Sequence, residues 1–224
     1  MNGRSQGNPW SLRQTGVYQK INFDTGCSNY IILHMSKSVR KRLDWIIKEH
    51  VPGYFSELDP MQLHLLILLS TADNWGEYIA HIYLKLKDMV REFLLKALSY
   101  ITQKLLILVW QNEKACFSNV ESRSTPDYAL AFSDIQALQK LKDKVLTISL
   151  VLDSCLEVAH QLATFCWQLG DQSILPHARN ATASFEAYAD DIKTHQRKIA
   201  VILQSLDGTV NIVCFQHYTL NLRL

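Results

Sequence analysis

The stretch "FSDIQALQKLKDKVLTISLVLDSCLEVAHQLATFCWQLG" (residues 132–170) decides the fold of this chain. Its apolar side chains recur at steps of three and four residues, the spacing of a helix face that packs along another helix. Ser133 and Gln136 fit a capping box at its start, and Gly170 is a natural C-terminal stop. At 1.5 Å per residue the pattern predicts one helix of about 55 Å. The repeating positions are Ile135, Leu138, Leu141, Val145, Ile148, Leu152, Cys155, Ala159, Leu162 and Cys166.

A second stripe of the same kind follows the short connection "DQSILP" (residues 171–176). It predicts a helix over residues 177–207 that ends at Gly208. Two long helices with matching stripes and a short connection predict an antiparallel helical hairpin. The second stripe consists of Phe185, Tyr188, Ile192, His195, Ile199, Ile202 and Leu206.

A third helix is predicted upstream, capped by Asp59 with Pro60 at its first position. It starts with the apolar run "MQLHLLILL" (residues 61–69), after which the apolar residues are confined to one face of the helix. A slight bend is expected at Gly76. We expect this helix to complete a three-helix bundle and residues 112–131 to form a loop. Its stripe consists of Trp75, Ile79, Ile82, Leu86, Met89, Phe93 and Ala97.

The N-terminal part has a different pattern. Residues 1–16 are predicted to be a disordered lead, and two β-rich runs around "DTG" (residues 24–26) predict a hairpin over residues 17–33. Ser36 is the expected N-cap of a helix over residues 37–50. The predicted fold is mainly α (α+β), with one domain over residues 17–208 and an irregular tail over residues 209–224.

Composition narrows the function classes. The chain has 224 residues and a net charge of +2. Such a small charge gives no strong electrostatic attraction to nucleic acid. Five widely spaced cysteines without a CxxC motif are typical of a reduced, intracellular protein without a cysteine-based zinc site. We therefore expect a cytoplasmic location and no nucleic-acid partner.

Two apolar runs raise the question of a membrane span, at residues 63–69 and 105–110. A spanning helix needs about 20 mostly apolar residues. Both runs are much shorter and end at polar residues, so we interpret them as buried helix segments. His64, inside the first run, is expected to be packed with its ring nitrogens hydrogen-bonded.

The best metal candidate is Asp153, Glu157 and His160, which share one face of the long helix at i, i+4 and i+7. Residues 157–160 also form an E-x-x-H unit of the kind that di-iron bundles use, but those bundles need two such units and no second one occurs. A solvated helix face explains the group better.

A second acidic and histidine group lies on the other long helix: Asp190, Asp191 and His195. His195 belongs to the apolar stripe, so a hydrogen-bonded core or interface histidine fits it better than a ligand. Cys155 and Cys166 also fall in a stripe, where cysteine behaves as a small apolar residue. We predict no catalytic residues, no resident cofactor and no enzyme activity.

Several segments together resemble the fungal CorA-like proteins, a group related to CorA metal-ion transporters. They are "VYQKINFDTGCSNYIILHMS", "HLLILLSTADNWGEYI", "FSDIQALQKLKDKVLTISLVLDS" and "LDGTV", and the resemblance covers roughly residues 17–210. It implies a cytosolic α/β domain followed by a very long helix, two C-terminal transmembrane helices with a Gly-Met-Asn motif, and pentamers that conduct Mg²⁺ or related divalent ions. No Gly-Met-Asn occurs in the chain, so no pore or metal-binding residue is carried over.

Three functions follow as expectations. The first is the cytosolic portion of a CorA-like divalent metal-ion transporter, without transport activity of its own because the spanning helices are expected to be missing. It would form homo-oligomers through its long-helix stripes and reach the membrane only through spans absent from the chain. The second is a helical interaction or scaffold module without a transport role. An enzyme built on Asp153, Glu157 and His160 is a distant third.

Overall fold

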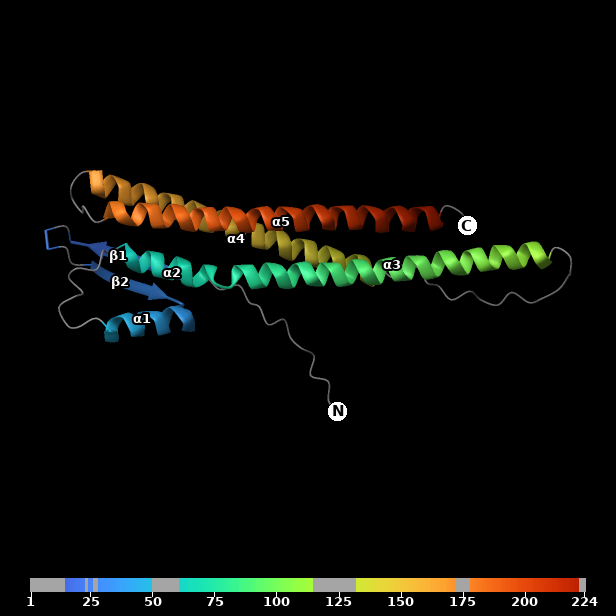
Figure 1. Cartoon of the computed structure of the whole chain (residues 1–224), viewed down its shortest axis with the longest axis horizontal. Helices are drawn as coiled ribbons and strands as arrows, with labels where there is room; N and C mark the ends of the chain where they lie inside the picture. The colour runs from blue at the N-terminus through green and yellow to red at the C-terminus, as the bar shows by residue number, and fades with distance from the viewer. Residues whose placement is uncertain are drawn as a thin grey trace, which may run out of the picture. The chain divides into compact units, whose positions relative to one another are not determined.

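A computed structural model describes residues 15–22, 24–25, 28–49, 61–114, 132–171 and 178–221. These residues form a two-stranded sheet and five helices, so the predicted class, mainly α with a small β-hairpin, is confirmed (Figure 1). The chain divides into two compact units. Unit 1 comprises Met1–Tyr78 and Val151–Gln196, and unit 2 comprises Ile79–Leu150 and Arg197–Leu224.

The hairpin of unit 1 consists of β1 (Gly16–Ile21) and β2 (Ser28–Leu33), paired antiparallel with Tyr18 opposite Ile31. The Asn22 carboxamide oxygen accepts hydrogen bonds from the backbone N–H groups of Asp24 (3.0 Å) and Thr25 (3.4 Å), which holds the turn. One face of the ribbon is half-buried and the other is exposed, because side chains alternate along each strand.

Helix α1 (Lys37–Glu49) starts where the sequence predicts. The Ser36 hydroxyl accepts a hydrogen bond from the Val39 backbone N–H at 3.2 Å, which confirms Ser36 as the N-cap. Arg42 donates to the Ser70 hydroxyl at 3.1 Å and forms an ion pair with Asp73, so α1 is tied to the next helix.

The predicted third helix is two helices, α2 (Gln62–Ala72) and α3 (Trp75–Lys114), so the single helix with a bend at Gly76 is wrong. The break lies at Asp73–Asn74, where short polar side chains compete with the helix for backbone hydrogen bonds. Met61 occupies the N-cap position of α2, which begins two residues later than predicted, and Asp59 and Pro60 lie outside the described residues.

Helix α4 (Phe132–Asp171) matches the predicted rod to within two residues at each end. Helix α5 (Ala178–Asn221) does not stop at Gly208 but runs through it, so the predicted end there and the irregular tail up to residue 221 are wrong. A glycine inside a helix costs about 1 kcal/mol relative to alanine. Leu206 is fully buried before Gly208 and Val210 is half-buried after it, and this packing offsets that cost.

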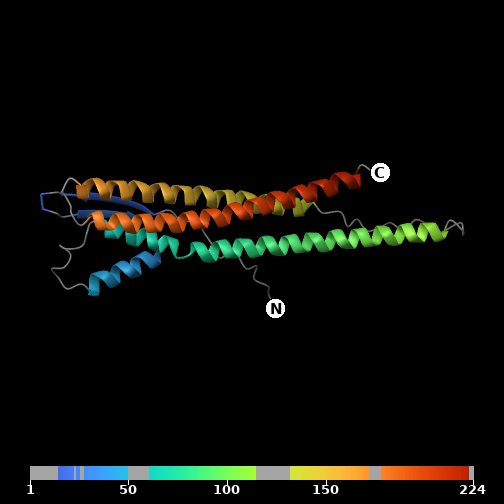
Figure 2. The ribbon, with the colours of Figure 1, turned by 45° about the horizontal axis from the view of Figure 1, so that its top comes forward.

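In unit 1 the second half of α4 runs antiparallel to the first half of α5 (Figure 2). Arg179 bonds Asp171 at 3.5 Å at one end, and Gln196 donates to Asp153 at 2.6 Å at the other. Gly170 allows the close approach at the end of the pair, because a Cβ there would lie 3.0 Å from the Cβ of Arg179.

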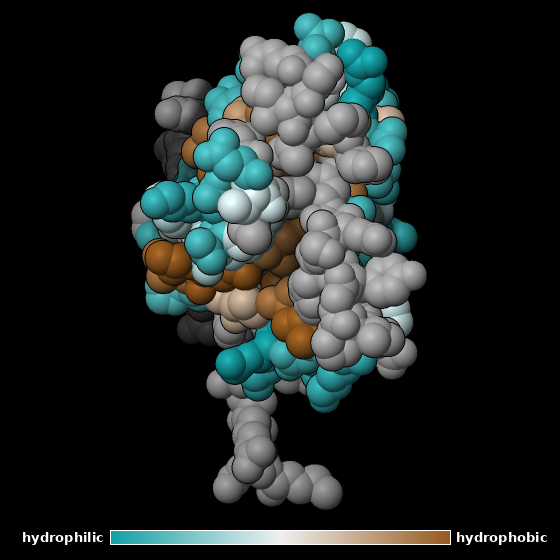
Figure 3. Space-filling model, turned by 90° about the vertical axis from the view of Figure 1, so that its left-hand side faces the viewer, coloured by the Kyte–Doolittle hydropathy of each residue, from teal (hydrophilic) through white to brown (hydrophobic). Residues whose placement is uncertain are grey.

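The core of unit 1 is formed by buried residues from α2, α4 and α5, with Ile21 of β1 packed against them. Figure 3 views the end of the molecule that carries the hairpin turn, where apolar side chains show between polar ones. The cluster contains Met61, Ala163, Cys166, Leu169, Ala178, Ala181 and Phe185.

Unit 2 is built from three helical segments, and its contacts again give antiparallel neighbours. Lys96 of α3 bonds Asp134 of α4 at 2.8 Å, and Lys142 of α4 bonds Asp207 of α5 at 2.6 Å. Stripe residues from all three segments are buried, so this part of the predicted bundle is confirmed. They include Ile79, Ile82, Leu86, Phe93, Leu138, Leu141, Val145, Ile148, Ile199, Ile202 and Leu206.

Candidate functional site

The predicted metal candidates lie on the exposed side of α4. Asp153 accepts a hydrogen bond from Gln196 at 2.6 Å, and Glu157 accepts one from Gln161 at 2.7 Å. His160 is also exposed, one turn further along. In the part of the chain that the structure describes, no three His, Cys, Asp or Glu side chains come together as a metal-binding group. Two of the three candidates are therefore engaged by amides of neighbouring glutamines.

The second predicted group is divided between the surface and the interior of unit 1. Asp190 is exposed and forms an ion pair with Lys193 at 2.9 Å. His195 is half-buried, and its Cε1 lies 3.9 Å from where a Cβ on Gly76 would be. This position agrees with the interpretation of His195 as an interior histidine.

A buried polar contact joins α5 to α4 and α2. The Tyr188 hydroxyl is buried near the Cys155 thiol and the Thr71 hydroxyl, and it makes no hydrogen bond of normal geometry to either. Burial, and then the neighbouring Cys155, raise the pKa of Tyr188, while burial raises the pKa of Cys155. Both groups therefore stay protonated near neutral pH, and Cys155 is a poor nucleophile. The sequence placed both residues in stripes but gave no sign that they meet.

A hydrogen-bonded chain connects the hairpin to α2. His64 Nε2 lies 2.7 Å from Gln19 Oε1, and the Gln19 amide nitrogen donates to the Tyr30 hydroxyl at 2.7 Å. The Tyr30 ring meets the His64 ring edge-on, with centroids 6.1 Å apart. The predicted packing and hydrogen bonding of His64 are confirmed. Burial lowers the pKa of His64, because charging the imidazole there costs solvation.

Acidification should destabilise the wild-type chain relative to a His64→Gln variant. The folded-state pKa of His64 lies below the unfolded value of about 6.5, so the unfolded chain binds the proton more tightly. The contribution of neutral His64 to the free energy of unfolding is fully present above the unfolded-state pKa. It is lost as the pH falls through the folded-state pKa. Between pH 7.5 and pH 5, the melting temperature of the wild type should fall about 2–4 °C further than that of the variant. Circular dichroism melts at several pH values test this, and a constant difference would contradict it.

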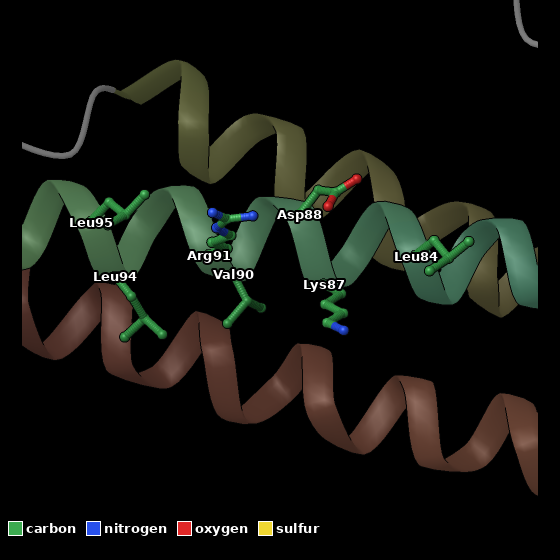
Figure 4. A pocket seen from close by; sticks show the side chains of 7 residues that line it. All are labelled: Leu84, Lys87, Asp88, Val90, Arg91, Leu94 and Leu95. Atoms are coloured by element: carbon green, nitrogen blue, oxygen red, sulfur yellow. The ribbon is translucent and has the colours of Figure 1, made fainter.

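A shallow groove of about 580 Å³ runs along α3 in unit 2 (Figure 4). Lys87, Val90 and Leu94 project from one side of the helix, and Asp88 and Leu95 from the other. Because a single helix supplies every lining residue, the groove is open and cannot enclose a small substrate. The lining residues are Leu84, Lys87, Asp88, Val90, Arg91, Leu94 and Leu95.

Among the described helices, residues Ser133–Asp171 of α4 are long and apolar enough to cross a membrane, judged by length and composition alone. The sequence predicted this helix but indicated membrane-span candidates only at residues 63–69 and 105–110. Its buried stripe and its exposed apolar residues, such as Leu146 and Leu150, together produce the apolar composition. The core helix of a soluble protein passes the same test.

The comparison that bears on identity concerns the N-terminal part. Residues 2–94 match the family model of the CorA-like transporters. This part of the chain is similar to the CorA-like transporters. The matched residues cover the hairpin, α1, α2 and the first half of α3, which agrees with the first two quoted segments of the resemblance. The resemblance over residues 95–210 lies outside the match and stays a prediction. No curated protein and no solved structure matches the chain.

Proposed function

We propose that this CorA-like chain is the cytosolic portion of a divalent metal-ion transporter of the Mg²⁺ type and conducts no ions by itself. The match of residues 2–94 to the CorA-like transporters carries the proposal. The proposal that the chain conducts no ions by itself is supported by the absence of a Gly-Met-Asn sequence from the printed chain, since the resemblance places that motif in the pore. Mg²⁺ is the cargo of the complete transporter in this proposal and is not a resident cofactor of the chain.

The chemistry of the chain supports a role without catalysis. The acidic candidates Asp153 and Glu157 are exposed and bonded to glutamines, and the Cys155 thiol is held protonated by burial. The groove on α3 is open along one helix. We therefore propose that the chain is not an enzyme and acts by assembling with other proteins.

Self-association is part of this proposal, but not through the stripes that the sequence suggests. Those stripes are already buried inside the two units by the chain's own helices. Homo-oligomers therefore need a different surface, and nucleic acid is not among the proposed partners, given the net charge of +2.

A helical interaction module without a transport role is the second candidate. The observation that favours it is the exposed apolar surface on α3 beyond residue 94, where the match to the CorA-like transporters ends. Such a surface is typical of protein interaction sites. Association with a complete CorA-like transporter separates the two candidates, since only the first predicts it.

Flotation with lipid vesicles tests the cytosolic assignment. The purified chain is mixed with vesicles of neutral and anionic phospholipids and centrifuged through a density gradient. We expect the chain to stay at the bottom, because α4 buries its stripe within the protein. Flotation that withstands alkaline carbonate would show an integral membrane protein and overturn the assignment. A Leu150→Lys variant, which places a charge on the exposed side of α4, then shows whether α4 is the inserted helix.

A further inference from the structure

Helix α1 carries a row of cations that the proposed function does not use. Arg42 of this helix donates to Ser70 and forms an ion pair with Asp73, so its charge is matched within unit 1. The other four cations of α1 are exposed, and none of them has an ion-pair partner among the residues that the structure describes. They are Lys37, Arg40, Lys41 and Lys48.

Three of these cations form a line along the helix. Lys37, Lys41 and Lys48 follow one another at steps of four and seven residues, which places them on one side of α1. At a rise of 1.5 Å per residue the line is about 16 Å long. The side of α1 that packs on the protein contains Val39, which is fully buried, and Leu43, which is half-buried. The lysines are therefore directed away from unit 1.

The stability of the helix gives no reason for this arrangement. The first turn of α1 has no acidic residue and contains Lys37 and Arg40, although the partial positive charge of a helix N-terminus favours anions. Like charges four residues apart, such as Lys37 and Lys41, also destabilise a helix. Asp44 is the only acidic residue between positions 37 and 48, so this side of α1 keeps a net positive charge. An anionic partner would relieve both repulsions.

An exposed tryptophan adds an apolar contact beside the lysines. Trp45 follows Lys41 by one helical turn, and 60% of its surface is exposed. Tryptophan is among the side chains that contribute most to binding when a partner protein covers them. We call these five residues the basic face of α1. It consists of Lys37, Arg40, Lys41, Trp45 and Lys48.

The packing of α1 favours a protein partner over a membrane surface. A helix that lies in a membrane interface buries its apolar face among the lipid headgroups. In α1 that face is already packed on the protein through Val39 and Leu43, which leaves Trp45 as the apolar side chain beside the lysines. The cations therefore lie on a helix that cannot turn its apolar face toward lipid while unit 1 is folded.

We propose that the basic face of α1 binds an acidic segment of a partner protein. Carboxylates of the partner pair with the cations, and an apolar side chain between them covers Trp45. The line of lysines matches about 11 residues of a partner helix or about five residues of an extended strand. This inference rests on the role in protein assembly proposed above, and it adds a surface and the chemistry of the partner.

Selection from a library of displayed random peptides tests the chemistry of the partner without presuming its sequence. The full-length wild type should enrich peptides that combine several Asp or Glu residues with a large apolar residue. A Lys37→Gln/Lys41→Gln/Lys48→Gln variant should recover these peptides at least about 10-fold less, because three exposed ion pairs are lost. Equal recovery by both proteins, or a wild type that enriches no acidic peptides, would overturn the proposal.

The matched control removes the same charge from another part of the chain. Lys87→Gln/Lys140→Gln/Lys198→Gln replaces three exposed lysines of unit 2 and should recover the peptides as well as the wild type does. Circular dichroism should show unchanged helix content in both triple variants. A control that loses the peptides equally would show general charge attraction and contradict a site on α1.

Trp45→Ala tests the apolar part of the basic face. Fluorescence anisotropy with a labelled peptide from the selection should give a dissociation constant raised at least about fivefold. An unchanged dissociation constant would show that the lysines act without Trp45 and would overturn the proposed face.

Two further outcomes separate this inference from its alternatives. Binding to anionic phospholipid vesicles that needs the same three lysines and displaces the selected peptide would assign the face to lipid and overturn the proposal. Lysine-dependent peptide binding without association with a complete CorA-like transporter would support this inference and count against the transporter proposal. Association with the transporter without lysine-dependent peptide binding would do the reverse.

Discussion

Replacing Ile148 with aspartate is expected to unfold unit 2, while the same replacement at Leu150 leaves it folded. Ile148 has 0% of its surface exposed, and Leu150, two residues further along α4, has 67% exposed. A buried carboxylate without a partner loses its hydration, and the substitution also removes a packed side chain. Together these effects should cost more than 4 kcal/mol, an amount reached only by substitutions that damage a core. A natural domain is typically stable by about 5–15 kcal/mol.

Leu150→Asp is the matched control, because it adds the same charge to the same helix and costs at least as much helix propensity as Ile148→Asp. Guanidinium unfolding followed by circular dichroism gives both free energies. If the stripe is the buried side of α4, the free energy of unfolding should be much lower for Ile148→Asp than for Leu150→Asp. Equal destabilisation would mean that this side of α4 is not the one that packs.

Truncating Phe185 to alanine should destabilise unit 1 by about 3–5 kcal/mol. Phe185 is fully buried in the cluster formed with Met61, Cys166 and other residues of α2, α4 and α5. Removing the ring leaves a cavity that the surrounding helices can close only in part. The melting temperature should fall by roughly 10 °C for a chain of this size.

Phe165→Ala is the matched control for this prediction, since Phe165 lies on α4 in the same unit but is 39% exposed. Its truncation should cost clearly less, at most about 1–2 kcal/mol. Thermal melts of the two variants give the comparison. Similar losses would place Phe185 outside the core and contradict the assignment of the stripe on α5.

Most of the fold could be predicted because its dominant signal is local and repetitive. The three-and-four spacing around Ile148, Phe185 and Ile82 is set by helix geometry, so the buried side of each helix could be predicted without knowing its partners. The hairpin and the Ser36 cap have equally local causes in turn and capping chemistry.

The errors fall where local preference and tertiary packing compete. Gly208 favours a helix end, but α5 continues through it from the buried Leu206 to Asn221. Asp73 and Asn74 break the helix, although the apolar pattern continues across them. The contact of Tyr188 with Cys155 and the bond between Gln19 and His64 join segments far apart in sequence, and no spacing rule indicates such pairs.

The apolar residues of α3 from Leu94 to Trp110 could not be distinguished from core residues in the sequence. In the structure eight of their large side chains are 50–61% exposed. The same ambiguity affects α4, whose apolar composition fits both a bundle helix and a membrane span.

Mg²⁺ flux into proteoliposomes tests most directly whether this chain conducts ions alone. The purified chain is reconstituted into vesicles that contain a Mg²⁺-sensitive dye, a Mg²⁺ gradient and a negative-inside potential are applied, and protein-free vesicles serve as the baseline. We predict an uptake rate equal to that baseline. Saturable, protein-dependent uptake of Mg²⁺ would contradict the account and show that the chain is itself a transporter.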